Sequence, residues 1–335
     1  MKIFPAKPRH PKPLGGDTTR STRSSSLLDL SKSILNNADR SYSLASPRKP
    51  SWIRAKIPSG ERYVAMRKNM ETHGLHTVCE EASCPNIADC WSRGTATIMI
   101  LGDICTRSCG FCNVRTGKPN PPDYDEPENV GKSISLMNLR HIVITCVDRD
   151  DLPDGGAQLW AETIQAAHRH APQTSVEALI GDFRGDKAAL DTVIDAKPEI
   201  LAHNLETVPR MHKAVRPQAT YTRSMQVLSR IRDAGLVSKT SIMVGIGETD
   251  EEVLEMLKDI RERAKTEIIT IGQYLQPSRN HLPVDRWVHP DQFAYYKEFG
   301  LALGFRVVES GPLVRSSFHA EEQVRNWELS RNNQK

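Results

Sequence analysis

Seven short apolar runs constrain the fold of this chain more than any other feature. They are rich in β-branched residues, and the segments between them have helical periodicity: "TATIMIL", "RHIVITC", "TSVEALI", "EILAHN", "TSIMVGI", "EIITIGQYL" and "FRVVES". One such segment, "DEEVLEMLKDIRERA", follows a capping residue, Thr249 or Asp250. Strands that alternate with helices pair in parallel, so the pattern predicts an α/β sheet or barrel.

Polar residues follow several of these runs. In a parallel barrel, side chains at the carboxyl ends of the strands face the active site. Candidate positions are residues 145–151, His203 and Asn204, residues 245–248, and Gln273 with Tyr274. We expect a functional site at this end of the barrel.

Charge and hydropathy limit the classes of partner. The 335 residues contain 45 Lys and Arg against 41 Asp and Glu, a net charge of +4, which implies no strong attraction to nucleic acid. No apolar run approaches the ~20 residues that a membrane helix needs, and no secretory signal is visible. We expect a soluble protein of a reducing compartment, the cytoplasm, that binds neither nucleic acid nor membrane.

Residues 1–50 differ in composition from the rest of the chain. They contain ten Lys and Arg against three acids, with few large apolar residues, which predicts a flexible basic arm. A transit peptide is also basic and acid-poor, so a mitochondrial or plastid matrix is the alternative location, although prolines interrupt the first residues. Ordered structure is expected from "KPSWIRAKIP", with a short helix in "GERYVAMRKNMETHGL" that Gly74 ends.

Six of the seven cysteines fall into two triads. The first is Cys79, Cys84 and Cys90, the second is Cys105, Cys109 and Cys112, and only Cys146 stands apart, where we expect a core residue. In a reducing compartment these thiols need a use other than disulfides.

Two kinds of metal site fit clustered thiols. Zinc takes four ligands, usually from paired C-x-x-C motifs, and only Cys109 and Cys112 have that spacing. An iron–sulfur cube held by three cysteines keeps one iron free for a substrate or cofactor. Gly110 lets the loop turn tightly around a cube. The cube is favoured, and a zinc-binding module remains the alternative.

The spacing C-x3-C-x2-C, with Phe111 before the last cysteine, resembles the signature of the radical S-adenosylmethionine enzymes. The resemblance implies a partial TIM-like (β/α)6 barrel and a 4Fe-4S cluster on Cys105, Cys109 and Cys112. Its open iron would bind S-adenosylmethionine, and cleavage would give a 5′-deoxyadenosyl radical. Hydrogen abstraction from an unactivated carbon requires a cofactor of this kind.

The first triad, "CEEASCPNIADC", and several further motifs resemble the lipoyl synthase family over some four-fifths of the chain. These include "HNLETVPR", "MVGIGETDEE", "GQYLQPSRNHLPV" and "GPLVRSSFHA". The resemblance implies insertion of two sulfur atoms into an octanoyl chain linked to a lysine of a lipoyl carrier domain. The sulfur would come from an auxiliary 4Fe-4S cluster on Cys79, Cys84 and Cys90.

The same resemblance assigns an oxygen ligand of the auxiliary cluster to Ser317, with Ser316 as the alternative. A hard oxygen among soft thiolates is displaceable, which suits a cluster that is taken apart. Arg315 would tune its charge. Phe318 replaces the tyrosine that is usual in the family.

Further residues are expected to contact S-adenosylmethionine or the acyl chain, because they lie in these motifs or at strand ends: Phe111, Asp148, Arg149, Glu177, Asn204, Gly245, Gly247, Tyr274 and Leu275. The alternative is that the strand-end polar residues only cap loops.

We expect four segments: a basic arm (1–50), an auxiliary-cluster extension (51–95), the barrel (96–310) and a C-terminal cap (311–335). Implied partners are octanoylated carriers (the glycine cleavage H protein and the lipoyl domains of 2-oxoacid dehydrogenase E2 subunits), an electron donor such as ferredoxin or flavodoxin, and cluster-assembly proteins. A methylthiotransferase-type enzyme is the alternative, but those usually add a basic RNA-binding domain, which this charge balance does not support.

Overall fold

The computed structural model describes residues 47–332, apart from gaps at 55–60, 73–75, 82–83 and 94. Most of the predicted basic arm, residues 1–46, lies outside the described residues, as does Gly74, the expected end of the first helix. The helix itself is confirmed as α2 (Glu61–Thr72).

The strands of the main sheet are β1 (His76–Thr77), β2 (Thr97–Ile100), β5 (His141–Cys146), β6 (Ser175–Leu179), β7 (Ile200–Ala202), β8 (Val237–Val244), β9 (Ile268–Gln273) and β10 (Val307–Gly311). A separate pair is formed by β3 (Ile104–Cys105) and β4 (Arg115–Thr116). The helices are α3 (Val78–Glu81), α4 (Ile87–Arg93), α5 (Glu126–Met137), α6 (Ala157–His170), α7 (Lys187–Asp195), α8 (His212–Val215), α9 (Tyr221–Asp233), α10 (Asp250–Asp259), α11 (Pro290–Ala302) and α12 (Ala320–Asn332), with shorter turns η1 (Phe183–Gly185), η2 (Pro209–Met211) and η3 (Ile260–Ala264).

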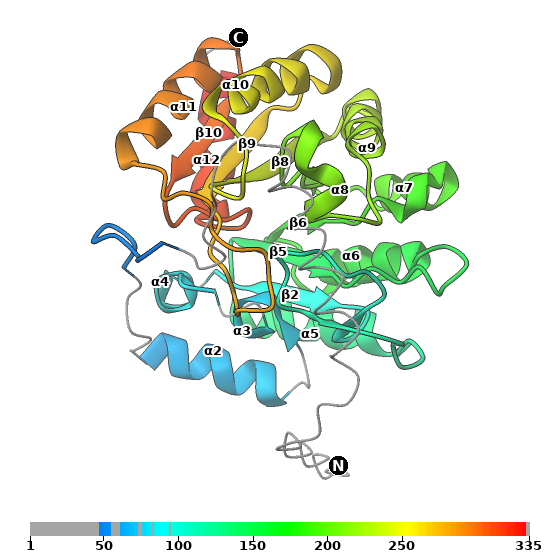
Figure 1. The fold of residues 1–335 in the computed structure, drawn as a ribbon. Coiled ribbons are helices and arrows are strands. Elements are labelled where there is room, and N and C mark those ends of the chain that lie inside the picture. Colours follow the sequence, from blue (N-terminus) through cyan, green and yellow to red (C-terminus); the bar gives the residue numbers. More distant parts are fainter. Residues whose placement is uncertain (1–46, 55–60, 73–75, 82–83, 94, 333–335) are drawn as a thin grey trace, which may run out of the picture. The chain divides into compact units, whose positions relative to one another are not determined.

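The sheet order is β1-β2-β5-β6-β7-β8-β9-β10. Only β1 is antiparallel to its neighbour, and every other pair is parallel, for example from Lys239↔Ile268 to Val244↔Gln273 between β8 and β9. Helices lie outside the curved sheet (Figure 1). All seven predicted runs form parallel strands, so the partial TIM-like barrel is confirmed. Its six β/α strands, β2 to β9, are extended by β10 at one edge and β1 at the other.

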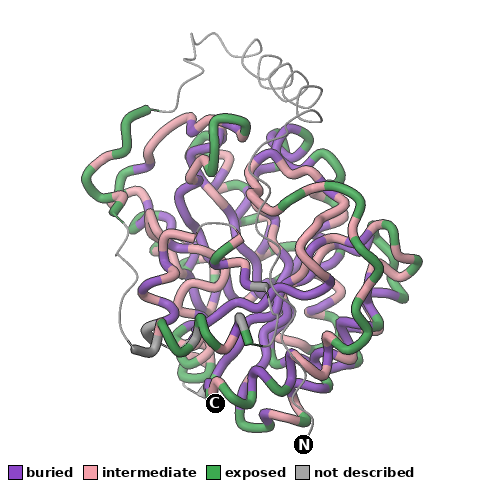
Figure 2. Tube along the Cα trace, turned by 90° about the horizontal axis from the view of Figure 1, so that it is seen from below, coloured by how far each residue is buried: buried purple, intermediate pink, exposed green. Residues whose placement is uncertain are grey.

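The core lies between the sheet and its helices. Ile142 and Ile144 of β5 and Trp160 of α6 are fully buried, because helices cover a parallel sheet and its strands are apolar on both faces. In Figure 2 the buried segments, in purple, run through the centre of the structure. In the described part of the chain, no helix has both the length and the apolar character that a membrane span requires.

The predicted helix after β8 begins as expected. Thr249 caps α10, since its hydroxyl accepts the Glu252 N–H while the Glu252 carboxylate accepts the Thr249 N–H. The helix is regular only to Asp259, because its last turn widens into the π-helix η3. The periodicity predicted the helix but not this widened turn.

A buried ion pair joins β6 to β8. The Lys239 Nζ donates to both carboxylate oxygens of Glu177, at 2.8 and 2.7 Å, and the two side chains are 1% and 0% exposed. The His141 Nε2 lies 3.5 Å from the same carboxylate. Burial opposes the charge on Glu177, but the Lys239 ammonium outweighs it and lowers the Glu177 pKa.

We expect Lys239→Met to lower the free energy of unfolding by about 3–5 kcal/mol, because it leaves a buried carboxylate without its partner. Urea denaturation measures this loss. Without Lys239, burial raises the Glu177 pKa of the folded variant above that of the unfolded chain. The free energy of unfolding of the variant therefore falls further as the pH rises through the raised pKa. The double variant Glu177→Gln/Lys239→Met should recover most of the loss, and a single variant as stable as the parent would contradict the prediction.

Candidate functional site

A cavity of about 520 Å³ lies at the carboxyl ends of the strands and brings the two cysteine triads together. The cysteines in its walls are Cys79, Cys84, Cys105, Cys109, Cys112 and Cys146. Its other walls come from the ends of β5 to β9 and from residues 314–317, after β10. The cavity thus lies at the end of the barrel where a functional site is expected.

The second triad lies on the loop between β3 and β4. The Thr106 N–H and hydroxyl donate to the carbonyl of Asp148, at 3.0 and 2.8 Å. The thiol sulfur of Cys105 accepts the N–H groups of Arg107 and Asp148, at 3.4 and 3.3 Å. Two backbone donors aimed at one sulfur stabilise a thiolate, which is the form that binds iron.

Arg107 anchors this loop, a role that the sequence analysis missed. Its side chain is 2% exposed and donates to both oxygens of Asp150, at 2.8 Å each, and to Asp182 at 2.7 Å. Burial opposes the charge on Asp182, but Arg107 outweighs it and lowers the Asp182 pKa to about 2. The sequence did contain a signal for this role. A basic residue lies inside the C-x3-C spacing, and acidic residues follow two of the predicted strands.

The thiols of the second triad are strongly desolvated. Burial raises the pKa of Cys109 to about 12 and that of Cys112 to about 11, and it also raises the pKa of Cys105. Arg216, which lines the same cavity, partly offsets the effect on Cys109. Metal binding would displace these protons.

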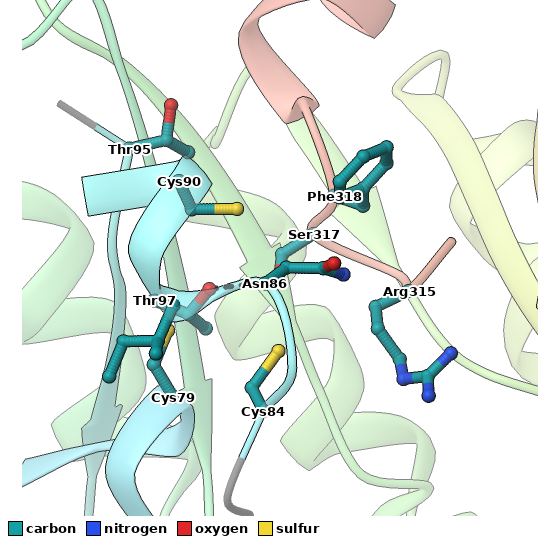
Figure 3. Close-up of a pocket in the computed structure, with 10 residues that line it drawn as sticks. Cys79, Cys84, Asn86, Cys90, Thr95, Thr97, Arg315, Ser317 and Phe318 are labelled. Carbon is teal, nitrogen blue, oxygen red and sulfur yellow. Dashed lines mark hydrogen bonds between the residues drawn. The ribbon is translucent and has the colours of Figure 1, made fainter. Parts of the chain in front are cut away.

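The first triad lines a smaller pocket, shown in Figure 3. Cys79 lies on α3, Cys90 on α4, and Cys84 in the segment between, where its N–H donates to the Cys79 carbonyl at 3.0 Å. Burial, reinforced by neighbouring thiols, raises the pKa of Cys79 to about 11 and that of Cys90 to about 12.

The segment after β10 completes this pocket. The side-chain amide of Asn86 donates to the Leu313 carbonyl at 2.6 Å, and the Thr97 hydroxyl donates to the Ser317 oxygen at 2.9 Å. Ser317 lines the pocket with all three cysteines, whereas Ser316 lines only the large cavity. The geometry thus favours Ser317 over Ser316. Phe318 packs against the buried cluster that contains Cys79, Cys90 and Trp91.

Three observations test whether these residues suit an iron–sulfur cluster. The buried indole N–H of Trp91 interacts with the Cys79 thiol and opposes the rise of its pKa, so it favours the thiolate that would bind iron. Arg315 lines the pocket and has no carboxylate within ion-pair distance in the described part of the chain, which suits an anionic neighbour. No three Cys, His, Asp or Glu side chains of that part converge on a single metal ion, as zinc requires, whereas a cube takes thiolates at separate corners. The residues fit a cluster.

Five of the predicted cofactor contacts line the large cavity: Phe111, Asp148, Asn204, Tyr274 and Leu275. The Asn204 side-chain oxygen is buried without a hydrogen-bond partner among the described residues, so it is free to accept from a ligand. The Tyr274 hydroxyl instead donates to the Leu282 carbonyl at 2.6 Å, so only the rest of this residue faces a ligand.

The other four predicted contacts lie outside the walls of this cavity, and they stay predictions. Glu177 is enclosed in the ion pair with Lys239. Arg149 donates to Asp151 and to the carbonyls of Leu101 and Asn120. Gly245 and Gly247 have positive φ, but at Gly245 the close approach is to the Gln273 side chain and the Arg286 carbonyl, where a Cβ would have no room. None of the four lines the cavity.

Several cavity residues were not predicted. Arg216, whose guanidinium donates to the Asn204 carbonyl at 2.6 Å, and Glu206, with a left-handed backbone at φ 67°, face the cavity. Cys146, expected in the core, packs against it and also lines the cavity. Lys49 joins the walls because the Trp287 indole donates to the Pro47 carbonyl at 2.9 Å.

Curated relatives match most of the chain. A lipoyl synthase of Christiangramia forsetii is 52% identical over 277 residues, 82% of this chain and 94% of that protein. One of Rubrobacter xylanophilus is 53% identical over 278 residues, 82% of this chain and 86% of that protein. A protein of Nematostella vectensis named "Lipoyl synthase, mitochondrial" is 52% identical over 277 residues, 82% and 95% of the two chains.

Two family models match, the radical SAM superfamily at residues 99–260 and the N-terminal domain of lipoyl synthase at residues 23–84. Solved structures share the fold. Streptococcus suis SuiB bound to S-adenosylmethionine has a TM-score of 0.53 at 10% identity, covering 68% of this chain and 54% of that one. A methylornithine synthase has a TM-score of 0.51 at 12% identity, covering 90% and 95%. At such identities the likeness concerns the fold alone.

Proposed function

Since this chain belongs to the lipoyl synthases, a family of radical S-adenosylmethionine enzymes that insert sulfur, we propose how its six clustered thiols divide that reaction. Cys105, Cys109 and Cys112 hold the 4Fe-4S cluster that binds S-adenosylmethionine. Cys79, Cys84 and Cys90, with Ser317, hold a second 4Fe-4S cluster, the source of both sulfur atoms. When bound, these groups supply a 5′-deoxyadenosyl radical and transferable sulfide.

One observation carries the proposal: cysteines of both triads line a single cavity of about 520 Å³. An octanoyl chain inside it is within reach of a radical source and a sulfur source without leaving the protein. Met99, Leu179 and Ile242 supply apolar walls for such a chain. The barrel and the two loops also keep water away from a reactive carbon.

The polar residues of the cavity position the cofactor. Asp148, after β5, and Asn204, after β7, are proposed to accept hydrogen bonds from S-adenosylmethionine, and Phe111 and Leu275 to contact its apolar parts. Arg315 holds positive charge beside Cys84, where an anionic cluster would lie, although burial lowers its own pKa. Ser317 is proposed as the weak ligand that leaves when sulfur does.

The substrate is a lipoyl carrier protein. We propose the glycine cleavage H protein and the lipoyl domains of E2 subunits as carriers, ferredoxin or flavodoxin as the electron donor, and cluster-assembly proteins as further partners. We propose a cytoplasmic location, and the mitochondrial relative supports a matrix location as the alternative. Residues 51–95 would serve as the auxiliary extension, 96–310 as the barrel and 311–335 as its cap. The predicted basic arm, residues 1–50, lies mostly outside the described residues.

Anaerobic turnover tests the proposal directly. The reconstituted chain should hold about eight irons and should convert an octanoyl-lysine peptide to the product with two added sulfur atoms, detected by mass spectrometry. About four irons with no added sulfur, or bound zinc in place of iron, would overturn the assignment. Peptide with an added methylthio group would identify the methylthiotransferase reaction instead.

A further inference from the structure

The loop that follows β9, residues 274–282, holds the cysteine loop in place. The Leu282 N–H donates to the Gly110 carbonyl at 3.0 Å, and the His281 Nε2 lies 3.0 Å from the Cys112 carbonyl oxygen. Neither His281 nor Leu282 lines the cavity, although Tyr274, Leu275, Gln276 and Pro277 of the same loop do. The two residues therefore support the cysteine loop without contacting a ligand in the cavity.

The imidazole of His281 is fixed by its neighbours. A carbonyl oxygen only accepts, so the Nε2 carries the proton and donates to Cys112. In the neutral ring the Nδ1 then accepts from the Ser278 hydroxyl, 2.9 Å away. The Gln276 side-chain amide donates to the His281 carbonyl at 2.9 Å. A ring held at both nitrogens and at its own backbone presents its donor in one direction.

Leu282 packs directly on the glycine of the cysteine loop. A Cβ at Gly110 would lie 2.9 Å from the Leu282 Cδ1, too close for any side chain while Leu282 keeps its position. The buried Tyr274 hydroxyl holds the Leu282 carbonyl, and the Gly110 N–H donates to the Val215 carbonyl at 2.9 Å. Both backbone groups of Gly110 are thereby satisfied from outside the loop.

Few hydrogen bonds hold the cysteine loop around its last cysteine. Within the loop the Cys112 N–H donates to the Cys109 carbonyl at 3.2 Å and the Val114 N–H donates to the Cys112 sulfur, while the Asn113 side-chain amide donates to the Glu81 carbonyl at 3.0 Å. A loop that must direct three thiols to one cluster loses conformational entropy on binding, unless other parts of the protein have already ordered it. The only side-chain hydrogen bond to the Cys112 carbonyl in the described structure comes from His281.

We propose that His281 is a positioning residue that orders the Cys112 end of the cysteine loop before iron binds. It acts through the Cys112 carbonyl and not on S-adenosylmethionine or substrate. The inference rests on the proposed assignment of Cys105, Cys109 and Cys112 to the radical cluster. It adds a residue of the β9 loop to the machinery that captures the cluster.

Hydrogen–deuterium exchange of the full-length chain without iron tests this ordering. In His281→Leu, amides of residues 105–114 should exchange about fivefold to tenfold faster than in the parent, which corresponds to the loss of one hydrogen bond. In His281→Gln, whose amide can still donate, they should exchange close to the parental rate. His168→Leu is the matched control, since this surface histidine pairs only with Glu199 among the described residues.

Parental exchange in His281→Leu, or equally fast exchange in the Leu and Gln variants, would overturn the proposal. Faster exchange over β5 as well would show that the His281→Leu variant has lost its fold. The test then rests on the two separate variants His281→Gln and Ser278→Ala. Ser278→Ala frees the ring to turn and should give intermediate exchange, and parental exchange in Ser278→Ala would then contradict the proposal.

A second measurement separates this inference from the proposed function. After anaerobic reconstitution, the reduced-cluster EPR signal and its change on adding S-adenosylmethionine should be altered in the Leu variant and restored in the Gln variant. A parent chain without that signal would refute the radical-cluster assignment, while the exchange result would stand. A parental signal in the Leu variant would show that the ordering has no effect on the cluster.

Discussion

Replacing Cys109 with alanine is expected to abolish cleavage of S-adenosylmethionine, down to the level of a control without enzyme. Cys109 is one of three thiols on the loop between β3 and β4, and two thiolates do not hold a cube with one open iron. About half of the iron should remain, because Cys79, Cys84 and Cys90 lie in a separate pocket. Chromatography of 5′-deoxyadenosine and an iron assay measure the two effects.

Cys146→Ser is the matched control for iron content. Cys146 lines the same cavity but belongs to neither triad, so its replacement should leave the full complement of iron. Cleavage that persists in Cys109→Ala, or a complete loss of iron from it, would contradict the division into two sites.

Replacing Cys84 with alanine is expected to have the opposite pattern. The chain should still cleave S-adenosylmethionine, since Cys105, Cys109 and Cys112 are unchanged, but it should add no sulfur to an octanoyl-lysine peptide. Cys84 lines both the small pocket and the large cavity, so its loss removes a ligand on the side that faces the substrate. Mass spectrometry of the peptide and a deoxyadenosine assay on the same sample separate the two activities.

The outcome that contradicts this prediction is peptide with two added sulfur atoms from Cys84→Ala, because the sulfur would then come from elsewhere. Ser317→Ala is a milder change at the same site. It removes the proposed oxygen ligand but keeps all three thiols, so iron should bind at the site while sulfur insertion falls. Ser316→Ala should behave like the parent, since Ser316 lies outside the small pocket.

The fold was largely predictable because its signals are local. Each parallel strand is a buried run such as "RHIVITC", and each cap is a short pattern such as Thr249 with Glu252. The π-helix η3 was not predictable, because a widened turn has the same apolar spacing as a regular one. The position of β1 at the edge of the sheet was not predictable either. It depends on pairing with β2, and a strand of two residues is too short to show a pattern in the sequence.

The site was predictable where one motif contains its own geometry. Three cysteines within eight positions must lie together, and the cavity contains them. The placement of Glu177 outside the cavity was not predictable, because its position in the sequence of a strand does not reveal its depth in the sheet. It pairs with Val143 and Ile200, closer to the start of the neighbouring strands than to their ends. Glu206 was missed although it lies in the motif "HNLETVPR", because nothing in the motif shows which of its side chains face the cavity. Arg216 was missed because a single arginine does not reveal its position without the fold.

The contacts of the small pocket have a consequence for biosynthesis. Asn86 bonds to Leu313, Thr97 to Ser317 and Asp89 to His319, so residues more than two hundred positions apart build one wall. A nascent chain emerging from the ribosome contains the three cysteines early, yet it contains no completed pocket until translation has passed residue 319. Delivery of iron to this pocket must therefore follow synthesis of nearly the whole polypeptide, and a protein truncated a few residues before Ser317 would expose the buried thiols of Cys79 and Cys90 to oxidation.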